Sequence, residues 1–154
     1  MLVLMCEAGD NRYALDTSCV VEIVPFIRLE RMSAAPAWLP GMFVYRGRAV
    51  HVVDLTHLTT GRPCPARRNS RIIVARFELP NVPPLLGLLA ERVTTAEINL
   101  DAQTAKSEQD TAELATYGRV LLDERGMFQL IEPARLLADE RLQAFQPIVS
   151  ESRG

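Results

Sequence analysis

The stretch that decides the fold is residues 41–55, which read Gly-Met-Phe-Val-Tyr-Arg-Gly-Arg-Ala-Val-His-Val-Val-Asp-Leu. Two short apolar runs flank a single Arg-Gly turn, and this pattern predicts a β-hairpin. Arg46 and Gly47 lie where the chain must reverse, so the Arg46 side chain is expected to face solvent, within reach of a partner. The segment therefore indicates binding rather than chemistry.

Short apolar runs recur along the rest of the chain, with turn-forming residues between them. This spacing and the scarcity of helical pattern predict a mainly β protein of the barrel or sandwich class. Residues 19–24 fit either a short helix or a strand, and Pro133 suits the start of a terminal helix that extends to about residue 145. The expected strands are residues 2–6, 13–15, 27–29, 43–45, 49–53, 72–77, 85–89, 93–98, 120–122 and 127–131.

A chain of 154 residues most often forms one domain, and we expect this domain to cover residues 1–145. The strands fall into two groups, which suggests two lobes, one of about residues 10–80 and the other of about 81–132 plus the first strand. Residues 100–117 are polar and predict a loop. Residues 146–154 predict a flexible tail.

The charge of the chain is unevenly distributed. The net charge is −2, but residues 1–90 carry ten arginines and seven acidic residues, whereas residues 91–154 carry seven basic and twelve acidic residues. This asymmetry suits an assembly surface with faces of opposite sign, and simple compositional scatter explains it equally well. An acidic balance argues against nucleic acid as the main partner.

Five arginines and no acidic residue lie between Asp54 and Glu78. A nucleic-acid surface needs aromatic side chains among its basic ones, and Phe77 alone is near. We therefore favour a solvated loop or a contact for an acidic protein face over RNA binding.

The cysteines and the N-terminus predict a cytoplasmic protein. Cys6, Cys19 and Cys64 form no CxxC pair, and an odd count without metal-ligand spacing is typical of reduced thiols. Residues 1–6 are apolar, but no basic segment precedes them and Glu7 ends the run too early for a signal peptide. No apolar stretch approaches the length that spans a bilayer, so we expect no membrane insertion.

Residue patterns for chemistry are missing from the sequence. His51 and His57 share no helix face, and His51 lies within an apolar run where a structural role is favoured over a ligand role. No phosphate-binding glycine loop and no Gly-x-Ser-x-Gly motif occurs. The acidic pair Asp123 and Glu124 falls at an expected turn, where solvated carboxylates are typical. We expect no catalytic residues, no metal site and no cofactor.

Tyr45-Arg46-Gly47 and the following residues 50–55 are similar to an R-G-x-x-x-P-x-x-D-L motif, which is the core motif of the CheW-like family of chemosensory adaptors. Other segments resemble the family in the same order along the chain, and the resemblance covers about residues 2–137. These segments are residues 13–16, 20–24, 36–41, 61–62, 70–74 and 87–93. No single motif is specific, so the resemblance rests on the ordered set.

This resemblance implies two SH3-like five-stranded β-barrel lobes with a short C-terminal helix, and no catalysis. It implies that the protein couples the cytoplasmic tip of methyl-accepting receptors to the regulatory domain of a CheA-type histidine kinase, at membrane-associated receptor arrays. The matching positions place Val20 and Glu22 in one part of the receptor-contact region, and Gly41, Arg46 and Gly47 in a second part. We expect Glu22 and Arg46 to brace one another or to add charge complementarity.

The sequence departs from the family motif at one position, because His51 stands where the family usually has proline. Histidine retains the backbone N–H that proline lacks, so this strand can pair differently. Two alternatives remain open, both built on a small SH3-like barrel. One binds RNA and is disfavoured by the acidic net charge, and the other binds a small-molecule ligand in a polar pocket between the lobes.

Overall fold

The structure is a computed structural model of the chain, and it describes residues 1–78, 84–103 and 117–144. The tail expected over residues 146–154 lies outside the described residues, as does most of the loop expected over 100–117. At the start of that loop, residues 100–103 instead form the short helix α2 (Leu100–Gln103).

Strands dominate the described residues, which confirms the mainly β prediction. The strands are β1 (Leu2–Ala8), β2 (Asn11–Asp16), β3 (Val20–Pro25), β4 (Gly41–Tyr45), β5 (Arg48–Asp54), β6 (Ser70–Arg76), β7 (Leu85–Glu97), β8 (Gly118–Asp123) and β9 (Gly126–Ile131). The other elements are the 3-10 turn η1 (Thr17–Cys19) and the helices α1 (Leu55–Thr60), α4 (Pro133–Leu137) and α5 (Glu140–Ala144).

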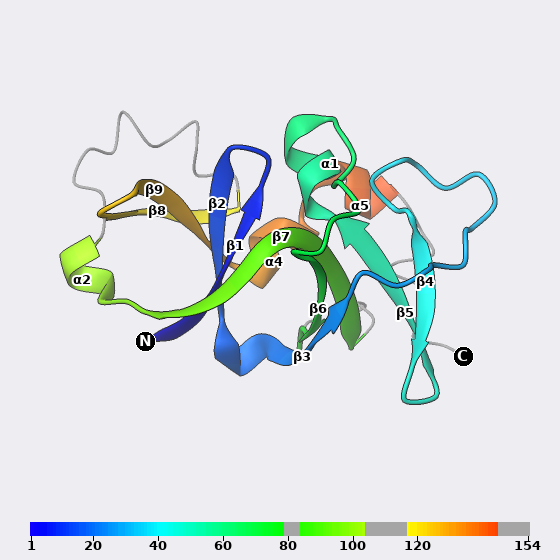
Figure 1. Cartoon of the computed structure of the whole chain (residues 1–154), viewed down its shortest axis with the longest axis horizontal. Helices are drawn as coiled ribbons and strands as arrows, with labels where there is room; N and C mark the ends of the chain where they lie inside the picture. Colours follow the sequence, from blue (N-terminus) through cyan, green and yellow to red (C-terminus); the bar gives the residue numbers. More distant parts are fainter. Residues whose placement is uncertain (79–83, 104–116, 145–154) are drawn as a thin grey trace.

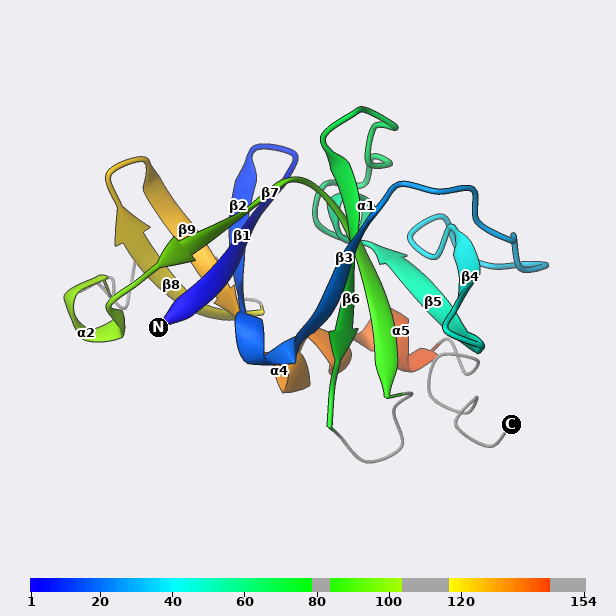
Figure 2. The same ribbon diagram turned by 60° about the horizontal axis from the view of Figure 1, so that its bottom comes forward.

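The strands form two lobes that share β7 (Figures 1 and 2). Lobe 1 contains β3, β6, the first half of β7, β5 and β4, and β5 runs parallel to β7. Lobe 2 contains the second half of β7, then β1, β2, β9 and β8, and β2 runs parallel to β9. The described part of each lobe thus has five strands. β2 belongs to lobe 2 because it forms a hairpin with β1, whereas its residues fall within the 10–80 group of the sequence pattern.

A bend in β7 carries the chain from one lobe to the other. Residues 85–91 pair with β6 and residues 91–97 pair with β1, so the strands expected over 85–89 and 93–98 are one continuous element. Arg92 has a φ of 51°, and the pairing register with β1 shifts between Met5 and Glu7. A bulge of this kind bends a strand without ending it.

Each lobe has its own apolar core, and a third core lies between them. Lobe 1 encloses residues such as Phe43, Tyr45 and Val74, and lobe 2 encloses residues such as Leu121 and Phe128. The inter-lobe core combines side chains from both lobes with those of the C-terminal helices. Its members include Leu4, Leu15, Trp38, Leu58, Ile73, Leu88, Tyr117, Leu136, Leu137 and Leu142.

The C-terminal segment forms two short helices rather than the single helix expected from Pro133 to about residue 145. Pro133 does occupy the start of α4, as predicted. The break occurs at Asp139, whose Oδ1 accepts a hydrogen bond from the Arg141 backbone N–H at 2.9 Å. An aspartate that caps a new helix in this way favours a restart over continuation.

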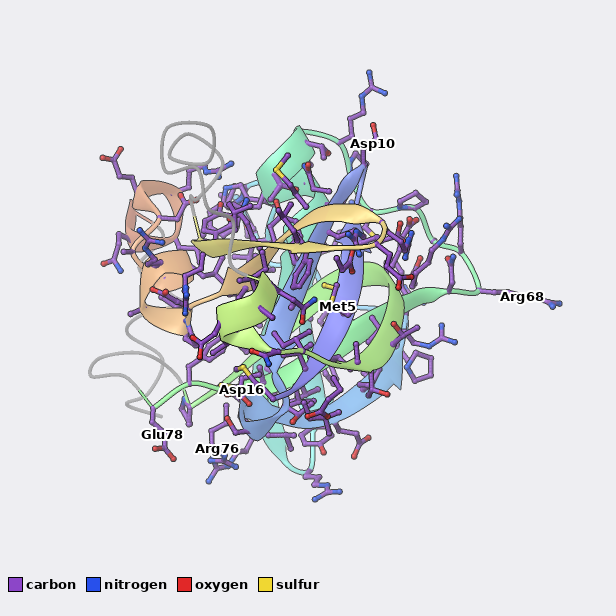
Figure 3. The ribbon with its side chains drawn as sticks, turned by 90° about the vertical axis from the view of Figure 1, so that its left-hand side faces the viewer. Met5, Asp10, Asp16, Arg68, Arg76 and Glu78 are labelled. Carbon is purple, nitrogen blue, oxygen red and sulfur yellow. The ribbon has the colours of Figure 1, made fainter. Side chains whose placement is uncertain are left out.

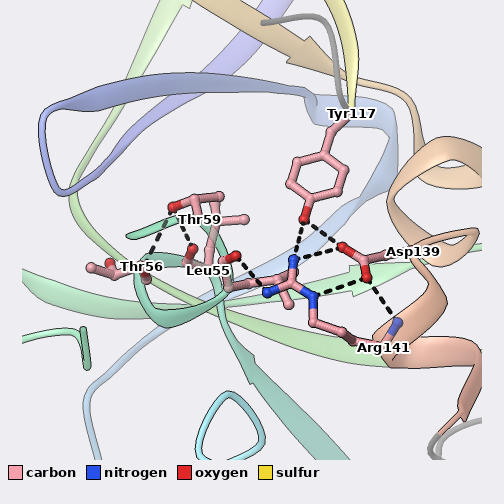
Figure 4. A network of polar contacts seen from close by, with 7 residues as sticks. Leu55, Thr56, Thr59, Tyr117, Asp139 and Arg141 are labelled. Atoms are coloured by element: carbon pink, nitrogen blue, oxygen red, sulfur yellow. Dashed lines mark hydrogen bonds and ion pairs between the residues drawn. The ribbon is translucent and has the colours of Figure 1, made fainter. Parts of the chain in front are cut away.

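Around this break, a polar clasp of Tyr117, Asp139 and Arg141 joins the two lobes (Figure 4). Arg141 Nη1 donates to the Leu58 carbonyl oxygen in α1 at 2.9 Å, and Nη2 donates to the Tyr117 hydroxyl at 3.2 Å. The Tyr117 hydroxyl donates to Asp139 Oδ2 at 2.7 Å. Burial alone would raise the pKa of Asp139, but hydrogen bonds from Arg141 and Tyr117 bring that pKa below its usual range.

Candidate functional site

The β4–β5 hairpin forms as predicted and presents the Arg46-Gly47 turn to solvent. Tyr45 pairs with Arg48 across a two-residue loop. Arg46 has a φ of 47° and Gly47 a φ of 78°, and positive values at both positions are typical of a type I′ turn. A Cβ on Gly47 would meet no atom within 4 Å, so glycine serves the backbone conformation here rather than a close contact.

Glu22, on β3, lies beside this turn and contacts Arg46, which is one of the two arrangements expected for this pair. Arg46 Nη2 lies 3.4 Å from Glu22 Oε1, and the Tyr45 hydroxyl donates to the same oxygen at 2.8 Å. The Arg46 guanidinium also lies over the Tyr45 ring, with 5.3 Å from Cζ to the ring centroid. Three side chains from β3 and the hairpin therefore form one connected group, which we call the Glu22–Tyr45–Arg46 triad.

The triad lies at the surface but is anchored from below. The side chains of Arg46 and Glu22 are 76% and 43% exposed, whereas Tyr45 is 8% exposed and belongs to the lobe 1 core. Burial raises the pKa of Tyr45, and the hydrogen bond to Glu22 raises it further. An exposed ion pair contributes only about 0.2–1 kcal/mol to stability, so the triad is better suited to orienting groups than to holding the fold.

Gly41 is not part of this surface. It is buried at the start of β4, and four residues of extended chain place it about 13 Å from Tyr45. A Cβ on Gly41 would lie 2.4 Å from the Glu30 carbonyl oxygen. Gly41 therefore allows the close approach of residue 30, which pairs with Met42 in an isolated bridge. That bridge is the only pairing described for the region near the strand expected over residues 27–29.

Val20 lies on a different face from Glu22. The register of β3 shifts between these residues, so that Val20 pairs with Ala75 and Glu22 pairs with Val74. Val20 packs against the inter-lobe core, whereas Val74 belongs to the lobe 1 core. The structure thus brings together Glu22, Arg46 and Gly47 from the predicted set, and it separates Val20 and Gly41 from them.

The sequence prediction gave no role to Tyr45, a member of the triad, or to Val44, which precedes it on β4. Val44 is 75% exposed, the most exposed large apolar side chain described in the molecule. On β3, Val21 and Ile23 are also exposed. Side chains alternate between the two faces of a strand, so the strand pattern over residues 41–45 could have predicted that Val44 points outward.

Polar residues elsewhere in lobe 1 have structural roles. Asp54 is buried, where its carboxylate accepts from the backbone N–H of His57 at 3.0 Å and from that of Cys64 at 2.9 Å. Burial raises the pKa of Cys64 to about 11, which leaves this thiol unreactive at neutral pH. His51 is buried within β5, opposite Met42. Within the described ranges, no cluster of three His, Cys, Asp or Glu side chains is arranged to hold a metal ion.

The arginines between residues 62 and 76 do not form one continuous surface. Arg68 extends from its loop on one side of the molecule and Arg76 lies at the far end of β6 (Figure 3). Arg71 turns back and donates to the carbonyl oxygens of Arg68 and Ser70. A separated set of this kind offers no continuous track for a nucleic-acid backbone.

Fold and site together describe a two-lobed β-barrel module that displays a paired acidic and basic group. A family model described as the CheW-like domain matches residues 2–141, and the chain belongs to this family. Among solved structures, the crystal structure of the scaffolding protein TtCheW from Thermoanaerobacter tengcongensis is similar, with a TM-score of 0.71 and 19% identity. That match covers 85% of this chain and 83% of the other. A comparison with curated proteins found no match.

None of the helices in the described ranges has the length and apolar character needed to cross a membrane.

Proposed function

We propose that this chain is a non-catalytic adaptor that couples a chemoreceptor-type protein to a CheA-type histidine kinase. Membership of the CheW-like family supports this function. The observation that carries the proposal is the Glu22–Tyr45–Arg46 triad, because it joins two residues that the family resemblance assigns to receptor contact. The two residues are 24 positions apart in sequence and meet at one oxygen atom, Glu22 Oε1.

In this proposal the receptor partner is the cytoplasmic tip of a methyl-accepting receptor, which presents a helical bundle. A helix of that bundle can place polar groups against Glu22 and Arg46, and Val44 offers an apolar contact on the outward face of the same hairpin. Gly41 and Gly47 act indirectly, since they shape the hairpin that carries Arg46. Val20, which packs against the inter-lobe core, would contribute to receptor binding from that side of β3. The protein would work in the cytoplasm at receptor arrays, with the kinase regulatory domain as its second partner.

The test measures binding of the full chain to two separate fragments, a receptor cytoplasmic tip and a kinase regulatory domain. We expect Arg46→Glu to weaken receptor-tip binding about tenfold, because it replaces an attractive charge with a repulsive one beside Glu22. Binding to the kinase domain should stay unchanged. Isothermal titration calorimetry with each fragment gives both affinities.

Arg48→Glu is the matched control, because Arg48 is an exposed arginine of the same hairpin that lies outside the triad. It should change receptor affinity by less than about twofold. Full receptor affinity in Arg46→Glu would remove Arg46 from the contact surface. Failure of the wild-type chain to bind either fragment would contradict the adaptor function itself.

A further inference from the structure

Tyr45 contacts both charged residues of the triad through different parts of its side chain. Its hydroxyl donates a hydrogen bond of 2.8 Å to Glu22 Oε1. Its ring lies under the Arg46 guanidinium, with 5.3 Å between Cζ and the ring centroid. One aromatic side chain therefore contacts an acidic group and a basic group at once.

The Tyr45 side chain is itself held in place. It is 8% exposed and packs edge-on against Phe43, with ring centroids 6.4 Å apart and an interplanar angle of 73°. Aromatic side chains have few rotatable bonds, so little conformational entropy is lost when they are held. Glu22 and Arg46 have longer and more exposed side chains. Their closest atoms are 3.4 Å apart, which is long for an ion pair, so their own contact constrains them weakly.

The hydrogen bond to Glu22 also crosses a seam in lobe 1. β3 is paired with β6, and β4 is paired with β5, but no ladder joins β3 to β4 in the part of the chain that the structure describes. Backbone pairing therefore connects Glu22 to the hairpin only indirectly, through β6, β7 and β5. The Tyr45 hydroxyl provides that link directly.

We infer that Tyr45 is a positioning residue for partner binding, which presents Glu22 and Arg46 as a pre-oriented acceptor and donor pair. This inference rests on the proposed function. Within the described residues, Glu22 Oε2 accepts no hydrogen bond, and Arg46 uses only Nη2, so an acceptor and further donors remain for a partner. Groups that are ordered before binding lose less entropy when the complex forms.

Two substitutions separate the functions of the hydroxyl and the ring. Tyr45→Phe removes the link to Glu22 but keeps the surface under Arg46, and we expect it to weaken receptor-tip binding about fivefold. Tyr45→Leu removes both contacts, and we expect a larger loss, about twentyfold. Neither substitution should change the affinity for the kinase regulatory domain. Isothermal titration calorimetry with the two fragments measures these affinities.

A double-substitution cycle shows whether Tyr45 acts through Glu22. In a Glu22→Gln background, Tyr45→Phe should have little further effect on receptor affinity, because the charged acceptor is already absent. Tyr13→Phe is the matched control, since it removes the hydroxyl of another buried tyrosine, on β2 in lobe 2. Thermal unfolding of every variant establishes that the fold is retained.

A measurement without any partner tests the positioning directly. The Arg46 Nε–H group should give an ordered NMR signal in the wild-type chain and a motionally averaged one in Tyr45→Leu. The inference is overturned if Arg46 is equally mobile in both, or if Tyr45→Phe binds the receptor tip as tightly as the wild type while Arg46→Glu does not. If the wild-type chain binds neither fragment, the adaptor proposal fails, and the NMR comparison still decides whether Tyr45 orders Arg46.

Discussion

At the scale of single residues, the shortest ion pair described in lobe 2 joins Arg12 and Asp123. Arg12 Nη1 and Nη2 donate to the two carboxylate oxygens of Asp123 at 2.7 and 2.6 Å, and the guanidinium lies 5.5 Å from the Phe128 ring centroid. The hydrogen bond from Arg12 holds the pKa of Asp123 below its usual range. This pair fastens β2 to the β8–β9 hairpin.

We expect Arg12→Met to lower the free energy of unfolding by about 1 kcal/mol at pH 7. The control is Arg48→Met, which should change the free energy of unfolding by less than about 0.5 kcal/mol. Because the pKa of Asp123 is lower in the folded state, the pair stabilises the fold above about pH 4 and this stabilisation is lost as pH falls toward the folded-state pKa. The difference between wild type and Arg12→Met should therefore shrink below pH 4. Urea unfolding at several pH values measures it, and a difference that is constant with pH would contradict the assignment.

Single residues also show how far the sequence predicts the candidate site. The family resemblance placed Glu22 and Arg46 in one contact region, and the structure brings them together. The sequence did not predict Tyr45 as the link between them. Its partner Glu22 is 23 positions away, on a strand with which β4 forms no ladder. Val20 and Gly41 were separated from the pair by a register shift and by burial, neither of which a local pattern reveals.

At the scale of secondary-structure elements, the clasp of Tyr117, Asp139 and Arg141 attaches α5 to the rest of the molecule. We expect Arg141→Met to reduce the free energy of unfolding by about 1–2 kcal/mol, because the Tyr117 hydroxyl and the Asp139 carboxylate both lose a partner. Amide hydrogen exchange should become faster in α5 and at the end of α1, where the Leu58 carbonyl is released.

The control for this change is Arg135→Met, on the neighbouring helix α4. Among the described residues, Arg135 forms only an exposed pair with Glu132 at 3.7 Å, so its replacement should cost less than about 0.5 kcal/mol. Equal effects of the two substitutions would mean that the clasp contributes nothing beyond an ordinary surface charge.

Most elements were predictable from apolar runs and turn residues, and the exceptions have local causes. Arg92 adopts a positive φ without being glycine or asparagine, so no residue type marked the bend at which two expected strands join into β7. Asp139 ends one helix by capping the next, although the apolar spacing on either side is compatible with a single helix. The 3-10 turn at residues 17–19 explains why residues 19–24 fitted both a helix and a strand.

At the scale of the whole molecule, β7 makes the two lobes mutually dependent. A cut between residues 78 and 84 would leave residues 1–78 without β7, which pairs with β6, β5 and β1. We expect residues 1–78 and residues 84–144 each to be unfolded alone and to form the native fold when mixed, as measured by circular dichroism and NMR. Independent folding of residues 1–78 would show that lobe 1 does not need its central strand.

The parallel pairing of β2 with β9 has a consequence for synthesis on the ribosome. Tyr13 and Ala14 pair with Gln129 and Leu130, so β2 emerges more than one hundred residues before its second neighbour. Until β9 appears, the β1–β2 hairpin exposes an unpaired strand edge and apolar side chains that later enter the lobe 2 core. Such long-range closure is slow and prone to aggregation, so the nascent chain is most vulnerable after lobe 1 has been translated and before residue 130 is released.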